Sequence, residues 1–316
     1  MLIRKSLNRI ILGWILMVVL VALLGDVTIA ASDNGRSSAD FLHIGQGARA
    51  AAMGGAYTAV SEGAIASYWN AAGLTGLEGP EVSLGHFAWY QDISVEQAAF
   101  ALPLKSRGLV AAASITYVNY GTVEGYDATG AYTGDLTVYD WVGGLSLGYM
   151  VNDQLSVGVT GKFVNQKLDD FSASTFAADL GLKYYFRDFT LAAAVTNFGG
   201  NMTFDETAES LPTAARIGIA ARPFGNSMVA SLEVEQRFEG DLILRQGIEM
   251  GFSNRYYLRT GYDYLPSQDG RNLSTALSFG AGIRLDMASF DYAYTPNDKT
   301  TSEDLHRFTL VFSLGR

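Results

Sequence analysis

Apolar residues recur at every second position in many segments between residue 81 and the end of the chain. In the segment 155–162, Leu155, Val157 and Val159 are apolar, and the residues between them are small or polar. This alternation is typical of β-strands whose two faces meet different surroundings. We predict about fourteen such strands, each about 9 to 14 residues long. Their centres lie near Leu84, Ala98, Ser114, Leu145, Thr160, Leu180, Ala193, Gly218, Leu232, Gln246, Arg259, Leu277, Phe290 and Leu310.

The connections between these segments alternate in length. Short ones are expected at Lys105–Arg107, Asn152–Gln154, Arg187–Asp188, Pro223–Asn226, Ser253–Arg255 and Leu285–Asp286. Longer, more polar ones are expected at Gly121–Asp135, Gly199–Leu211, Pro266–Asn272 and Pro296–Asp304, and Glu239–Asp241 is a brief exception. A soluble β-sandwich or lipocalin-like barrel gives no reason for this alternation, whereas a membrane barrel has short periplasmic turns and long outer loops. The predicted fold is therefore all-β, a transmembrane antiparallel β-barrel of about 14 strands over residues 81–316.

Residues 40–77 lack the alternation and are rich in Gly and Ala. Helical turns are expected at Ala48–Ala52 and Ser61–Tyr68, and Asn70 is a suitable N-cap for a further short turn. A barrel of about fourteen strands encloses more space than its own side chains fill. We therefore predict that residues 31–80 form a short helical N-terminal plug segment. It should enter the lumen from the periplasmic end, where the first strand begins.

Residues 1–30 have the pattern of a secretory signal peptide. Basic residues at positions 4, 5 and 9 precede an apolar run from Ile10 to Leu24, which is short for a membrane-spanning helix, and small residues follow. An uncleaved membrane anchor is the alternative. Export and the barrel together predict a bacterial outer-membrane protein whose partners include the membrane lipids.

Composition removes several classes of function. The net charge of −10 disfavours nucleic acid as a partner. The absence of cysteine from the sequence excludes disulfides, thiolate metal sites and a cysteine nucleophile. The 17 tyrosines and 17 phenylalanines suit strands that meet a membrane interface.

A resemblance to a known family lies in residues 41–74, which read FLHIGQGARAAAMGGAYTAVSEGAIASYWNAAGL. This segment resembles the N-terminal signature of the PorV/PorQ family, which belongs to the FadL-like outer-membrane barrels. The matching residues are Phe41, Leu42, Gly45, Gly47, Ala48, Arg49, Met53, Gly54, Gly55, Ala56, Ala59, Trp69, Asn70, Gly73 and Leu74. The family usually has Pro where this chain has Ala71, a change that leaves the Asn70 cap in place.

The resemblance implies a fourteen-stranded barrel with the N-terminal segment at or in its lumen. In the best-understood members it also implies a non-enzymatic role in type IX secretion, with a translocon and the C-terminal signal domains of cargo proteins as partners. FadL relatives instead carry hydrophobic small molecules across the outer membrane. Secretion is the first hypothesis, and transport of hydrophobic molecules past a movable hatch is the alternative. A structural barrel without a transport role is the third.

The candidate functional side chains are charges expected to face the lumen. Arg49 is a lone cation in its segment, and we expect it to anchor the plug by pairing with a lumen carboxylate. The alternative is that Arg49 binds a carboxylate of a partner protein or of a gate. The lumen charges singled out are Arg216, Glu233, Glu235, Arg245, Glu249, Arg259 and Asp263. Among these, the carboxylates with which Arg49 could pair are Glu233, Glu235, Glu249 and Asp263. Mixed signs on one wall indicate a salt-bridge lining rather than acid–base catalysis.

We predict no enzyme activity, no metal site and no cofactor. The three histidines lack a metal-ligand spacing. His86 has Ser83 on the opposite strand face, so the two cannot form a nucleophile–base pair. The glycines between residues 45 and 55 indicate tight turns and close packing, because no P-loop lysine follows them.

Overall fold

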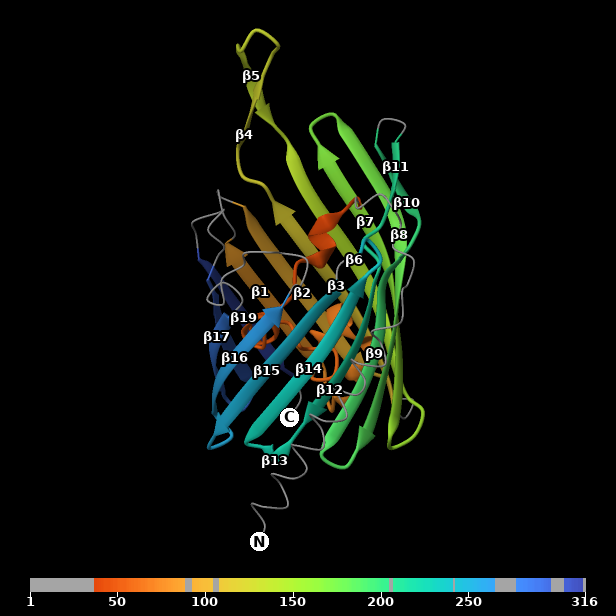
Figure 1. The fold of residues 1–316 in the computed structure, drawn as a ribbon, viewed down its shortest axis with the longest axis vertical. Helices are drawn as coiled ribbons and strands as arrows, with labels where there is room; N and C mark the ends of the chain where they lie inside the picture. Colours follow the sequence, from red (N-terminus) through yellow and green to blue (C-terminus); the bar gives the residue numbers. More distant parts are fainter. Residues whose placement is uncertain are drawn as a thin grey trace.

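Fourteen strands form one closed antiparallel barrel (Figure 1). The computed structural model describes residues 37–88, 93–104, 108–204, 207–240, 242–264, 277–296 and 304–314. The barrel strands are β1 (Glu81–Ala88), β2 (Ser94–Pro103), β3 (Leu109–Asn119), β6 (Val138–Met150), β7 (Leu155–Leu168), β8 (Phe171–Phe186), β9 (Phe189–Gly199), β12 (Ala214–Ala221), β14 (Met228–Arg237), β15 (Leu242–Phe252), β16 (Tyr256–Tyr264), β17 (Leu277–Arg284), β18 (Ala288–Thr295) and β19 (Leu305–Ser313). Each pairs with its neighbours in this order, and β1 pairs with β19 to close the sheet.

The strand prediction is confirmed, because each of the fourteen expected centres falls in a different barrel strand. The outer face carries the apolar side chains: Leu145 and Phe176 are each 72% exposed. The inner face of the same strands carries polar ones, such as Ser146 and Thr160, which are buried and hydrogen-bonded to each other at 2.8 Å. An apolar outer face and a closed hydrogen-bonded wall are what a lipid environment requires of a barrel.

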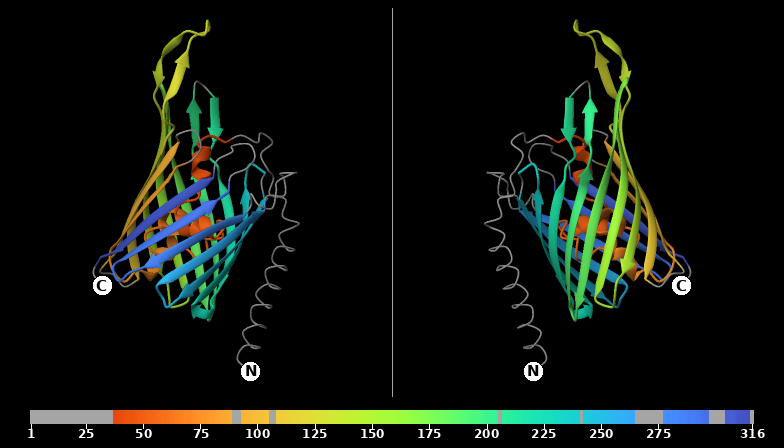
Figure 2. Two further views of the ribbon diagram at one scale, coloured as in Figure 1. Left: turned by 90° about the vertical axis from the view of Figure 1, so that its left-hand side faces the viewer. Right: turned by 90° about the vertical axis from the view of Figure 1, so that its right-hand side faces the viewer.

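The two ends of the barrel differ. At the long-loop end, the hairpins β4 (Val123–Tyr126)–β5 (Tyr132–Leu136) and β10 (Asn201–Phe204)–β11 (Thr207–Ser210) stand beyond the barrel (Figures 1 and 2). At the opposite, short-turn end lies β13 (Pro223–Asn226), which connects β12 to β14. Two connections expected as polar loops are therefore hairpins. The predicted connections Lys105–Arg107 and Pro266–Asn272, and most of Pro296–Asp304, lie outside the described residues.

The N-terminal segment lies inside the barrel and contains η1 (Asp40–His43), α2 (Ala48–Ala52), α3 (Ala66–Trp69) and η2 (Ala71–Gly76) (Figure 1). The first helix has its expected bounds, and Asn70 caps η2 by accepting a hydrogen bond from the amide of Ala72 at 3.1 Å. The helix expected from Ser61 begins only at Ala66, because Gly63 adopts a φ of +72° that interrupts a helix. No helix of the described residues is long and apolar enough to cross a membrane.

The described part of this segment runs lengthwise through the lumen. At the long-loop end, the amide of Ser38 donates to the carbonyl of Ser210 at 3.0 Å. At the short-turn end, Glu81 opens β1 opposite Ser313. The expectation that the segment enters from the end where the first strand begins is therefore wrong. The start of the described segment is held at the long-loop end because Phe41 packs against apolar inner-wall residues there.

Close packing of the segment against the wall depends on inward-facing wall glycines. A Cβ added at Gly158 would overlap the backbone of Ala71 and Ala72, and one added at Gly261 would overlap Gly54. A Cβ at Gly247 would lie 2.6 Å from the carbonyl oxygen of Met53. At these three positions the wall lacks a side chain because the backbone of the segment lies directly against it.

A first prediction compares two glycines of β7. Gly158→Ala should lower the free energy of unfolding by about 1–3 kcal/mol, because the new methyl group overlaps the plug backbone. Gly161→Ala should change it little, because nothing lies within 4 Å of the Cβ that it adds on the outer face. Urea titration of both variants in lipid vesicles measures the difference. Equal stability of the two would show that the plug does not press on the wall at β7.

Candidate functional site

Beside the hydrogen-bonded polar group of Tyr120, Asp140 and Gln166, the lumen wall carries a group of apolar side chains at the long-loop end. We call this group the outer apolar cluster: Phe41, Phe87, Val95, Val118, Val142, Val164, Ala173, Ala177, Met202 and Leu211. Most of these side chains come from the inner faces of β1, β2, β3 and β6 to β8, and Phe41 comes from the N-terminal segment. Val95, Val118 and Val164 have no exposed surface. Phe41 packs in the same cluster as these valines, which are covered from the lumen.

Charged residues surround the plug below this cluster. Arg49 holds Glu249 with two hydrogen bonds, at 2.7 and 2.8 Å, and reaches Glu62 at 2.6 Å. Glu249 also pairs with Arg259 at 2.6 Å, and Arg259 pairs with Asp291 at 2.7 Å. Burial alone would lower the pKa of Arg49, but Glu249, Tyr57 and Glu62 together raise it well above its ordinary value. Arg49 therefore stays charged and ties α2 to β15.

A second charged group centres on Glu235, which has no exposed surface. Its carboxylate accepts from Arg216 and Arg245 at 2.6 Å each and from Arg237 at 2.9 Å. Glu233 lies two residues before Glu235 in β14, and its carboxylate accepts a hydrogen bond from the amide of Thr58 in the plug at 2.7 Å. Asp263 stands opposite Arg245 in the β15–β16 register. The structure thus places all seven singled-out lumen charges in the wall strands around the plug, and the contacts given above join charges of opposite sign.

The remaining motif residues shape the plug itself. Gly47, Gly54 and Gly55 have φ values of +84°, +63° and +76°, which favour glycine. Gly73 leaves room for the carbonyl of Ser61, and Gly45 lies against the ring of Trp69. The indole N–H of Trp69 donates to the carbonyl of Gln46 at 2.9 Å, and Met53 and Leu74 are fully buried. These glycines make turns and close contacts, and the described residues provide no phosphate cradle around them.

An open cavity of about 330 Å³ lies between the plug and the wall at the short-turn end. Its lining includes Arg49, Glu62, Arg222 and Glu249, together with Tyr57. The same cavity is also lined by apolar side chains such as Ile65, Leu77 and Val229, so its lining is mixed. The alternative hypothesis of hydrophobic transport predicted an apolar pocket between plug and wall. The apolar contacts between plug and wall at the long-loop end are those of Phe41 with the outer apolar cluster.

One wall strand is irregular but closed. The β8–β9 register shifts between Ala178 and Leu180, and Asn197 on β9 has a φ of +59°. Its amide donates to Asp179 at 2.8 Å, and its side-chain oxygen accepts from Lys162 at 2.8 Å. Lys162 and Asp179 also form an ion pair at 2.7 Å. The residues at the bulge are therefore held in place by polar contacts between β7, β8 and β9.

The outer face of β1 and its neighbours carries a groove of about 430 Å³ lined mainly by apolar side chains such as Leu84, Ile115 and Phe308. His86 lies at this groove and contacts Glu96 through Nδ1 at 2.7 Å. Ser83 is buried on the inner face. His86 and Ser83 are thus separated by the wall, as the strand alternation indicated.

Sequence reasoning missed the polar wall residues that fix α2. The amide of Gly47 donates to Gln97 at 3.1 Å, and the amide of Ala48 donates to Thr309 at 2.8 Å. Both wall residues occupy inward positions in the alternation, which is the only signal that could have found them. It also missed the convergence of Asp40, His43 and Glu239 at the long-loop end, because Glu239 is far away in the sequence.

No family model and no curated protein sequence matches this chain. Its fold is similar to several solved structures. The toluene transporter TodX of Pseudomonas putida has a TM-score of 0.58 and 15% identity, covering 84% of this chain and 96% of that one. The toluene transporter TbuX of Ralstonia pickettii has a TM-score of 0.59 and 17% identity, covering 84% and 97%. A FadL homologue of Pseudomonas aeruginosa has a TM-score of 0.57 and 11% identity, covering 85% and 98%.

At these identities the likeness establishes the fold. Nothing in the comparisons supports the expected membership of the PorV/PorQ family or a role in type IX secretion. The chain is a closed barrel of fourteen antiparallel strands with the architecture of FadL-like outer-membrane barrels.

Proposed function

We propose that this chain is an outer-membrane channel for small hydrophobic molecules and has no enzyme activity. The observation that carries the proposal is the outer apolar cluster. Val95, Val118 and Val164 occupy inward positions that would be polar in a water-filled pore. A lumen wall of this kind favours an apolar solute over a hydrated one.

Phe41 gives the N-terminal segment the role of a hatch in this proposal. Its side chain is 5% exposed and occupies the cluster that a hydrophobic solute would bind. Entry of a solute therefore requires Phe41 to leave, while the ion pairs of Arg49 keep the rest of the segment seated. The similar folds of TodX and TbuX, which are described as toluene transporters, support this reading over protein secretion.

The proposal predicts a loss of uptake when the cluster becomes polar. The double substitution Val118→Thr and Val164→Thr preserves side-chain volume but adds two hydroxyl groups without partners. We expect it to lower the initial rate of toluene uptake about tenfold, since an unpaired buried hydroxyl costs about 1–3 kcal/mol. Val229→Thr is the control, because Val229 lines the cavity at the short-turn end, away from the outer apolar cluster, and its replacement should leave uptake unchanged.

The measurement is uptake of radiolabelled toluene by Gram-negative cells that lack their own hydrocarbon channels and express the protein. The uptake rate should rise on expression of the wild-type chain. Equal uptake with and without the protein would contradict a channel for hydrophobic molecules. Specific binding of C-terminal sorting domains to the purified barrel, without any effect on toluene uptake, would restore the secretion hypothesis.

A further inference from the structure

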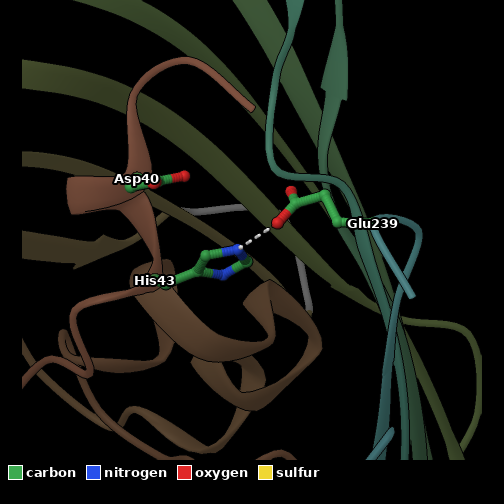
Figure 3. A group of neighbouring side chains, drawn as sticks. All are labelled: Asp40, His43 and Glu239. Atoms are coloured by element: carbon green, nitrogen blue, oxygen red, sulfur yellow. Dashed lines mark ion pairs between the residues drawn. The ribbon is translucent and has the colours of Figure 1, made fainter. Parts of the chain in front are cut away.

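Three potential metal ligands converge at the long-loop end of the lumen. Asp40 and His43 belong to η1, and Glu239 belongs to the connection between β14 and β15 (Figure 3). One ligand atom from each residue lies within 4.8 Å of the others. Residues three apart share one side of a 3₁₀-helix, so Asp40 and His43 can face the same point. Figure 3 shows the imidazole of His43 directed at the carboxylate of Glu239.

Asp40 accepts a hydrogen bond from Ser37 Oγ at 2.6 Å, but the polar atoms of the other two residues are only partly paired. Both ring nitrogens of His43 and Oε1 of Glu239 are buried and have no hydrogen-bond partner among the described residues. His43 Nε2 lies 3.6 Å from Glu239 Oε2, which is too long for a hydrogen bond. Buried polar atoms are normally paired, so an imidazole and a carboxylate left in this state point to a ligand.

The donor set and its spacing fit one class of ion. An imidazole nitrogen with two carboxylate oxygens suits Zn²⁺ and related transition metals, whereas Ca²⁺ and Mg²⁺ take oxygen ligands. Ligands at about 2.1 Å from a tetrahedral Zn²⁺ lie about 3.4 Å from each other. The 3.6 Å between His43 and Glu239 is already close to this value. Asp40 is exposed, and the hydrogen bond that its carboxylate accepts from Ser37 is also exposed, so side-chain rotation can bring an oxygen to the site.

We propose that Asp40, His43 and Glu239 form a binding site for a divalent transition metal, with Zn²⁺ as the best-fitting ion, that ties η1 to the barrel wall. Two ligands come from the N-terminal segment and one from the wall, so the ion bridges the two. Phe41 lies between the two η1 ligands in sequence, and the ion therefore holds Phe41 in the outer apolar cluster. Metal binding stabilises the seated form of this part of the segment. The site exists whatever solute the barrel carries.

The direct test is titration of the purified full-length protein, without a polyhistidine tag, with Zn²⁺ alone by isothermal titration calorimetry. We expect one Zn²⁺ per chain at micromolar concentrations. His43→Ala and Glu239→Gln should each weaken the affinity by about tenfold or more, the range found when groups that support a metal site are removed. His306→Ala is the matched control, because His306 lies on the exposed face of β19 against Tyr292 and should leave Zn²⁺ binding unchanged.

Hydrogen exchange provides the second readout. Zn²⁺ should slow exchange of the amides of η1 in the wild-type protein and in His306→Ala, but not in Glu239→Gln, which leaves the segment itself unaltered. Ca²⁺ at the same concentration should have no effect. The proposal is overturned if the wild-type chain binds no Zn²⁺, if His43→Ala and Glu239→Gln bind it as tightly as the wild type, or if Ca²⁺ protects η1 equally well.

Discussion

Glu235→Gln is expected to lower the free energy of unfolding by about 3–5 kcal/mol, the usual cost of leaving buried charges without their partner. The substitution keeps the size of the side chain and removes its charge. Arg216, Arg237 and Arg245 all donate to the Glu235 carboxylate at 2.6 to 2.9 Å. Without it, three guanidinium groups converge on a neutral amide inside a closed barrel. Glu233 lies 3.8 Å from Arg245, and its other carboxylate oxygen is engaged by the amide of Thr58.

The measurement is urea-induced unfolding in lipid vesicles, followed by the intrinsic fluorescence of the tryptophans. Glu124→Gln supplies the matched control, since Glu124 is exposed on the β4–β5 hairpin, where its carboxylate accepts a hydrogen bond from Tyr126. Its effect should stay within about 0.5 kcal/mol. A similarly small effect of Glu235→Gln would mean that the arginines are neutralised without Glu235, and the charged ring would then contribute little to stability.

The barrel was predictable because its signal is local. The alternation of Leu155, Val157 and Val159 with small residues repeats in each strand, and a lipid-facing wall leaves little freedom to depart from it. The outward position of Leu145 and the inward position of Thr160 follow from the same rule. The order of strands then follows, because short and long connections alternate between antiparallel neighbours.

The course of the plug was not predictable, because it depends on contacts between residues distant in sequence. Helix α3 begins late partly because the amide of Ala64 donates to Glu81 at 2.7 Å, across the end of the segment. Likewise, the amide of Ser38 finds its partner at Ser210 in a hairpin whose existence the polar loop composition did not reveal. The Asp40–His43–Glu239 group has the same origin, since no motif spacing connects its members.

The motif of the N-terminal segment is now explained by packing. Gly54 needs a positive φ, Gly73 leaves room for Ser61, and Asn70 caps η2. The requirement at Gly54 comes from packing against the wall, and those at Gly73 and Asn70 come from packing within the plug. Such residues report how a plug is seated and carry no information about what passes it. A resemblance in this motif therefore supports the barrel-with-plug architecture, while the apolar inner wall carries the argument about the solute.

Gly54→Val is expected to open the lumen while the barrel stays folded. The φ of Gly54 is +63°, and a Cβ there would lie 2.6 Å from the backbone nitrogen of Tyr262. A β-branched residue is strained in this conformation, and the overlap is with wall backbone that cannot move aside. The strands pair with one another independently of the plug, so the wall should remain closed when this part of the segment leaves it. A fourteen-stranded barrel without its plug leaves a water-filled passage.

Single-channel recording in planar lipid bilayers measures this change, and we expect the ion conductance to rise at least about tenfold over that of the wild type. Gly76→Val is the control within the same segment, because nothing lies within 4 Å of the Cβ that it adds and its conductance should match the wild type. Heat-modifiable migration on a gel verifies that both variants keep the barrel. A folded Gly54→Val barrel with wild-type conductance would mean that the ion pairs of Arg49 with Glu249 and Glu62 alone keep the lumen closed.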